Sequence, residues 1–178
     1  WEFMNLFLRG RTKVSALYDK PNVNGLDDFI TSTREKFGAR MFPINISGLR
    51  EVFKSLERNE LLVFLPDQVP DYGARGFIGT FFGHDAYTSD LVHRVISKYD
   101  SEIVFGLVMR DFSEGRVKYR ICFEKPADEI YAKDIGVHIS SLNSSLERLV
   151  KKAPEQYQWS YKRYKRLNRS EKNIYRRQ

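Results

Sequence analysis

Asp67 and Gln68 are the polar side chains best placed for chemistry in this sequence. They follow the continuous apolar run at residues 61–65, separated from it only by Pro66, and such a short run is typical of a strand buried on both faces. Open α/β folds place their ligand crevices at the carboxyl ends of such strands. Position therefore makes this pair the best site candidate, and the residues leave equally open the alternative that Asp67 caps the turn that Pro66 begins.

The 3 histidines are the obvious candidates for a general base: His84, His93 and His138. His93 and His138 fall within helical patterns, and His84 follows the glycine-rich run at residues 66–83, where no Ser or Cys stands in a nucleophile elbow. Structural or solvent-exposed roles are favoured for all of them. The glycines match neither a GxGxxG nor a Walker pattern, so the sequence supports no nucleotide site.

Basic residues are concentrated at one end of the chain. Residues 1–147 hold 19 basic and 21 acidic residues, whereas residues 148–178 hold 11 basic and 2 acidic ones, interleaved with tyrosines and Trp159. Such a segment suits bilayer headgroups, a phosphorylated lipid, nucleic acid or an acidic carrier protein, and composition does not choose among them. Arg34 lies on a predicted helix and could point either to solvent or into a crevice.

The elements that must position these residues alternate between helical and strand patterns, which indicates one α/β domain. Ser47 is expected to cap the third helix. The predicted helices cover residues 1–8, 26–37, 47–58, 91–99 and 135–149, and the predicted strands cover residues 13–18, 41–44, 61–65, 77–82, 103–109 and 117–123.

The lone Cys122 excludes an internal disulfide, has no zinc-ligand spacing and favours a reducing compartment. We find no signal peptide and no apolar run of about 18 to 20 residues that could cross a bilayer.

Two signatures resemble the lysophospholipid acyltransferase superfamily, and specifically its lipid A acyltransferase branch. Residues 153–159, Ala-Pro-Glu-Gln-Tyr-Gln-Trp, and the basic residues behind them are similar to that branch's Pro-Glu-Gln-Tyr-x-Trp signature. Leu65-Pro66-Asp67-Gln68, followed by Phe81-Phe82-Gly83 and Thr88, resembles its Asp-Gln loop and Phe-Phe-Gly turn. The resemblance implies a mixed, mainly parallel β-sheet flanked by helices, as in glycerolipid acyltransferases.

Trp1-Glu2 looks like the end of the His-x4-Asp/Glu motif of this family. On that resemblance the histidine would stand five positions before Glu2, and the chain is expected to be an inactive fragment lacking its N-terminal part. The histidine would take the proton of an acceptor hydroxyl that attacks a thioester, and Glu2 would fix the imidazole. Arg34 would hold phosphate or oxyanion charge, and Asp67 and Gln68 would shape the substrate crevice. No metal and no cofactor is expected.

The resemblance also implies partners and a location. The donor would be acyl-carrier protein and the acceptor a lipid A precursor, at the cytoplasmic face of the bacterial inner membrane, with no nucleic acid bound. Residues 1–166 would form the acyltransferase domain and residues 167–178 a basic tail. The alternatives are an acyltransferase acting on another glycolipid, such as a phosphatidylinositol mannoside, and a non-catalytic basic module that binds membranes or nucleic acid.

Overall fold

The computed structural model describes residues 2–21, 23, 25–71, 73–113, 115–166 and 175. Trp1 of the predicted motif, Glu114 of the predicted hairpin turn and the tail at 167–178, apart from Tyr175, lie outside the described residues. The chain divides into two compact units. The first unit comprises Trp1–Phe64 and Asp111–Ile121, and the second comprises Leu65–Arg110 and Cys122–Gln178.

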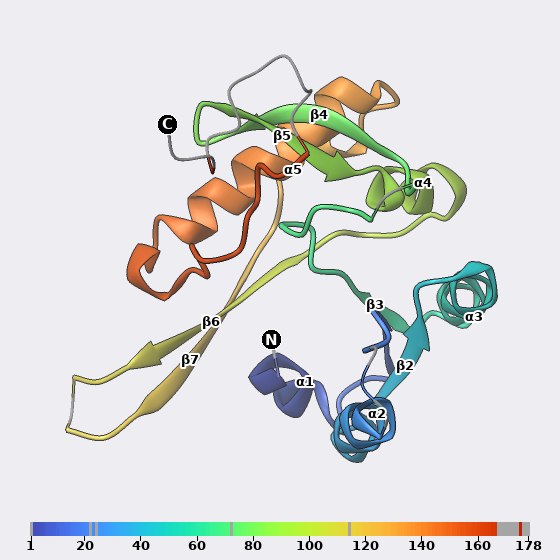
Figure 1. Cartoon of the computed structure of the whole chain (residues 1–178), viewed down its shortest axis with the longest axis vertical. Helices are drawn as coiled ribbons and strands as arrows, with labels where there is room; N and C mark the ends of the chain where they lie inside the picture. Colours follow the sequence, from blue (N-terminus) through green and yellow to red (C-terminus); the bar gives the residue numbers. More distant parts are fainter. Residues whose placement is uncertain are drawn as a thin grey trace. The chain divides into compact units, whose positions relative to one another are not determined.

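The first unit is built on a parallel three-stranded sheet (Figure 1). Its elements in chain order are α1 (Glu2–Leu8), β1 (Val14–Tyr18), α2 (Leu26–Lys36), β2 (Ala39–Pro43), α3 (Ile46–Glu57) and β3 (Leu61–Val63). The strand order is β2-β1-β3, and Ser15 of β1 stands opposite Arg40 of β2 and Leu62 of β3. The predicted α/β class with parallel strands is confirmed.

Two local predictions in this unit are wrong. The strand at 61–65 was expected to be buried on both faces, but the three residues of β3 are only partly buried, because β3 lies at the edge of the sheet and β1 at its centre. The third helix is capped by Asn45 and not by Ser47. Asn45 has extended backbone angles (φ −151°), so its side-chain oxygen can accept a hydrogen bond of 2.8 Å from Gly48 N at the first turn of α3.

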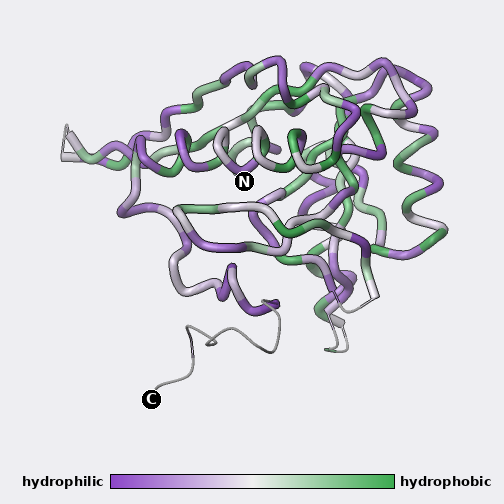
Figure 2. Tube along the Cα trace, turned by 90° about the horizontal axis from the view of Figure 1, so that it is seen from above, coloured by the Kyte–Doolittle hydropathy of each residue, from purple (hydrophilic) through white to green (hydrophobic). Residues whose placement is uncertain are grey.

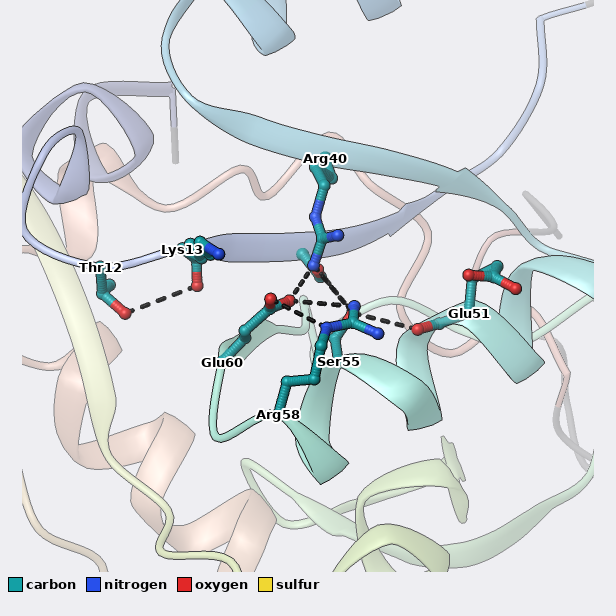
Figure 3. Close-up of polar contacts among 8 residues, drawn as sticks. Thr12, Lys13, Arg40, Glu51, Ser55, Arg58 and Glu60 are labelled. Carbon is teal, nitrogen blue, oxygen red and sulfur yellow. Dashed lines mark hydrogen bonds and ion pairs between the residues drawn. The ribbon is translucent and has the colours of Figure 1, made fainter.

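A buried carboxylate joins the elements of the first unit. The Glu60 side chain is only 5% exposed and is bound by Arg58 at 3.0 Å and by Arg40 (Figure 3). Behind this ion pair, the hydroxyl of Ser15 donates to that of Ser55 at 2.9 Å. One carboxylate therefore connects β2 with the turn that leads into β3, and two arginines neutralise its charge, as burial requires.

The second unit pairs a β-hairpin with a long helix. Its elements are β4 (Gly76–Phe81), β5 (His84–Ser89), α4 (Leu91–Lys98), β6 (Phe105–Asp111), β7 (Lys118–Glu124), the 3-10 turn η1 (Asp128–Tyr131), α5 (Ile135–Val150) and the 3-10 turn η2 (Pro154–Gln156). Asp111, the last residue of β6, and residues 118–121 of β7 belong to the first unit. β4 and β5 form one antiparallel pair, and β6 and β7 form a separate two-stranded sheet, as their predicted pairing required.

The Phe-Phe-Gly signature forms the turn of the β4–β5 hairpin. Phe81 pairs with His84, so only Phe82 and Gly83 connect the strands. Both have positive φ, 48° and 76°, which is the conformation that a two-residue hairpin turn demands. The strand β5 was not predicted, and it places Ala86 and Thr88 in the core of the unit.

The core of the second unit lies between β4 and α5. Gly79 of β4 faces α5 so closely that a Cβ added there would lie 2.5 Å from Cγ2 of Ile139. The helix α5 buries Ile139, Leu142, Leu146 and Leu149, in agreement with the predicted periodicity. None of the described helices is long and apolar enough to span a membrane, and hydrophilic and hydrophobic residues alternate along the coloured part of the trace in Figure 2.

Candidate functional site

Glu2 and Arg34 form an ion pair within the first unit. Nε and Nη2 of Arg34 lie 3.0 and 2.9 Å from Oε1 of Glu2. The helix α1 carries Glu2 in its first turn, and α2 carries Arg34 in its last turn. The buried Asn5 reinforces the junction, because its Nδ2 donates to the backbone oxygen of Arg34 at 3.2 Å.

This pairing joins two of the four predicted site residues. The Arg34 side chain is 22% exposed and the Glu2 side chain 49% exposed, so solvent and ligands can reach the pair. Arg34 was expected to point either to solvent or into a crevice. Its guanidinium instead faces the carboxylate of Glu2. Both described bonds end on Oε1, and the guanidinium places a positive charge beside Glu2.

Asp67 and Gln68 belong to the second unit and lie in a tight turn. Gln68 N donates to Leu65 O at 3.4 Å, so a turn does begin at Leu65-Pro66 as expected. Asp67 is partly buried and Gln68 is exposed. The next backbone amide, Val69 N, donates to the hydroxyl of Tyr161 at 2.8 Å, which ties this loop to the C-terminal segment.

The C-terminal segment does not present all of its basic residues to solvent. Arg163 is only 2% exposed. Its Nη1 donates to Tyr87 O and its Nη2 to Thr88 Oγ1, both at 2.7 Å. The interpretation of residues 148–178 as a basic segment for anionic partners is therefore wrong for Arg163, because the strand β5 supplies buried acceptors for its guanidinium.

Burial around Arg163 also shifts the titration of its neighbours. Burial raises the pKa of the Tyr157 hydroxyl well above its usual range, and the nearby Asp67 carboxylate raises it further. Burial lowers the pKa of Arg163, although the neighbouring Tyr157 and Asp67 oppose that shift. Sequence reasoning missed Arg163 as a site-associated residue, and the available signal was its place a few residues after the Pro-Glu-Gln-Tyr-x-Trp signature.

The three histidines are held by local contacts. His138 is fully buried in α5, its Nδ1 lies 2.6 Å from Ile130 O, and burial lowers its pKa. The ring of His93 lies 5.0 Å from that of His138, and its Nε2 lies 3.1 Å from Lys133 O. His84 packs its ring against Tyr164 at 5.7 Å. These packing contacts agree with the structural roles that the sequence favoured.

A family model described as bacterial lipid A biosynthesis acyltransferase matches residues 1–166. The chain belongs to this family. Both signatures quoted above, and Glu2, Arg34, Asp67 and Gln68, fall within the matched range. The resemblance predicted from the sequence to the lipid A acyltransferases is therefore confirmed.

Curated members of the lipid A acyltransferase family are similar to most of this chain. The palmitoleoyltransferase of lipid A biosynthesis from Escherichia coli strain K12 is 29% identical over 97% of this chain and 56% of its own length. The lauroyltransferase of the same strain is 24% identical over 82% of this chain and 47% of its own length. A lipid A biosynthesis acyltransferase from Haemophilus influenzae is 28% identical over 82% of this chain and 44% of its own length. The chain thus spans about half the length of the curated relatives it matches.

Proposed function

We propose that this chain is part of an enzyme that transfers a fatty acyl group from acyl-carrier protein to a hydroxyl of a lipid A precursor. The observation that carries the proposal is the Glu2–Arg34 ion pair in a chain of the lipid A acyltransferase family. A carboxylate held by an arginine is suited to orient an imidazole base, which is the role that the resemblance to the family motif implies for Glu2.

The proposed reaction is a direct acyl transfer. An imidazole five positions before Glu2 takes the proton of the acceptor hydroxyl while the hydroxyl oxygen attacks the thioester carbonyl. The new C–O bond forms, the C–S bond breaks, and the imidazolium returns the proton to the departing thiolate. Arg34 occupies Oε1 of Glu2, so Oε2 is the oxygen we assign to the imidazole N–H.

Arg34 has two roles in the proposed reaction. It restrains the Glu2 carboxylate, and we assign its positive charge to the stabilisation of oxyanion or phosphate charge. Asp67 and Gln68 are proposed to bind the substrate, because they lie in the Asp-Gln loop that resembles the family signature.

We assign residues 1–166 to the acyltransferase domain and residues 167–178 to a basic tail, and we propose that the protein acts at the cytoplasmic face of the inner membrane. The exposed Lys162 and Lys165 suit an acidic carrier protein or an anionic bilayer.

Replacement of Glu2 in the natural protein that contains this sequence tests the proposal. The Glu2→Gln enzyme should lose about a hundredfold or more in acyl transfer from acyl-carrier protein to a lipid A precursor, since the amide stabilises the imidazolium poorly. Glu35→Gln is the matched control, because Glu35 is exposed on α2 beside Arg34. Undiminished transfer by Glu2→Gln would remove Glu2 from the mechanism, and preference for another glycolipid acceptor would replace the assigned substrate.

A further inference from the structure

The segment Tyr157–Tyr164, here called the C-terminal clamp, contacts both the β4–β5 hairpin and the Asp67 loop. On the hairpin side, Tyr164 donates its hydroxyl to Phe81 O at 3.1 Å, and Arg163 donates to Tyr87 O and Thr88 Oγ1 at 2.7 Å. On the loop side, the hydroxyl of Tyr161 accepts from Val69 N at 2.8 Å. The clamp therefore connects the loop to the hairpin, although Val69 and Tyr161 lie 92 positions apart.

Arg163 is the residue that fixes the clamp on the hairpin. A guanidinium that is 2% exposed is destabilising unless its N–H groups find acceptors. Its Nη1 and Nη2 find acceptors on two successive residues of β5, whereas its buried Nε has no hydrogen-bond partner among the described residues. The Cζ of Arg163 lies 5.4 Å from the ring of Phe81. Thr88 in turn donates to Asn143 Oδ1 of α5 at 3.3 Å, so this anchor reaches the core helix.

The tyrosines of the clamp lie against the loop that carries the proposed substrate-binding residues. Tyr161 holds the Val69 amide, which is two positions after Asp67. Tyr157 packs its ring 6.4 Å from that of Phe81, and the Asp67 carboxylate lies near enough to the Tyr157 hydroxyl to raise the pKa of that hydroxyl. The Asp67 loop is thus held by a hydrogen bond from its backbone at Val69, and the Tyr157 hydroxyl lies near the Asp67 side chain.

We propose that Arg163 is a positioning residue, which holds the C-terminal clamp on β5 so that Tyr157 and Tyr161 fix the Asp67–Gln68 loop for substrate. This inference rests on the proposed function of Asp67 and deepens it. Arg163 does not touch substrate. It acts through Tyr161 and Tyr157, and its loss widens the range of positions that the loop occupies.

Hydrogen exchange in the chain itself tests the mechanical half of the inference. Tyr161→Phe removes the acceptor of Val69 N and should speed exchange of the Val69 amide by about tenfold or more, with little change in Tm. Arg163→Met should also speed exchange of the Val69 amide, and Arg163→Lys should restore part of the protection of this amide against exchange. Lys162→Met is the matched control, because Lys162 is the exposed neighbour of Arg163. Val69 exchange that is the same in Tyr161→Phe and the unmodified chain overturns the inference.

Steady-state kinetics in the natural protein test the functional half. Tyr161→Phe and Arg163→Lys should raise KM for one substrate by roughly tenfold, with a smaller effect on kcat, because a loosened loop weakens binding. Asp67→Asn separates the two proposals. If Asp67→Asn leaves both constants unchanged, the proposed role of Asp67 fails. If Asp67→Asn impairs binding while Tyr161→Phe and Arg163→Lys change neither constant, the positioning role fails.

Discussion

Arg34 binds Glu2 with two nitrogens on one oxygen: Nε and Nη2 lie 3.0 and 2.9 Å from Oε1. A guanidinium can make this contact because its donors form a planar fork, and an ammonium cannot reproduce it. The interaction crosses 32 positions of sequence and joins α1 to α2. The orientation of the Glu2 carboxylate therefore depends on a residue of another helix.

This geometry predicts that Arg34→Lys impairs acyl transfer even though the charge is kept. Loss of the second donor should reduce kcat/KM by about tenfold to a hundredfold, the range expected for a hydrogen bond to a charged group. Acyl transfer in the natural protein measures the effect. Lys36→Gln is the control, because Lys36 is an exposed cation of the same helix. Full activity in Arg34→Lys would show that only the positive charge matters.

The buried Glu60 is predicted to be a stability determinant of the first unit. Glu60→Ala leaves the guanidinium groups of Arg40 and Arg58 without their shared carboxylate. Because both arginines are partly exposed, we expect a loss of about 2 to 4 kcal/mol in the free energy of unfolding, less than for a fully buried pair. Urea denaturation of the Glu60→Ala variant and the unmodified chain measures this change in the free energy of unfolding. Glu51→Ala removes an exposed carboxylate paired with Lys54 on α3 and should have a much smaller effect.

Gly79 is predicted to tolerate no side chain. A Cβ at this position would meet Cγ2 of Ile139 at 2.5 Å and Nδ2 of Asn143 at 3.2 Å, and both belong to the core face of α5. Gly79→Ala should therefore lower the free energy of unfolding by about 1 to 3 kcal/mol through overpacking. Thr80→Ala, at the exposed next position of β4, is the comparison. Equal stability of the two variants would contradict the close packing of β4 on α5.

His138 is predicted to make stability depend on pH. Burial lowers its pKa below the ordinary value of 6.5 in the folded state, and the neighbouring His93 adds to this shift. The unfolded chain then binds more protons, so the stabilising contribution is present above about pH 6.5 and is lost as the pH falls toward the folded pKa. Unfolding free energies measured from pH 8 to pH 5 should fall less steeply for His138→Asn. Identical slopes for the two proteins would exclude His138 as the group responsible.

Local periodicity accounts for the parts of the fold that were predicted. Apolar residues at helical spacing predicted the helix at residues 135–149, and α5 covers Ile135–Val150 with that face buried. The pattern is informative because a helix with one apolar stripe must place that stripe against a core. The strand β5 was missed because His84 and Asp85 give it a polar start, and its inward face becomes apparent only in the folded unit, where Ala86 and Thr88 are buried.

The choice between two suitable capping residues could not be made from the sequence. Asn45 and Ser47 are both favourable N-caps by residue type. Only the extended backbone at Asn45 decides that its side chain meets Gly48 N. Likewise, the short apolar run at 61–65 predicted a strand, but the burial of β3 depends on its place at the edge of the sheet.

The sequence by itself determined the family, the α/β class and the residue types at Glu2, Arg34, Asp67 and Gln68, since signatures and periodicity are properties of neighbouring residues. Only the tertiary structure decided that Arg34 binds Glu2 and that Arg163 is buried against β5. Both are contacts between residues far apart in the chain. Whether a cation meets solvent, a carboxylate or a buried carbonyl depends on which segments packing brings beside it, and no local pattern contains that information.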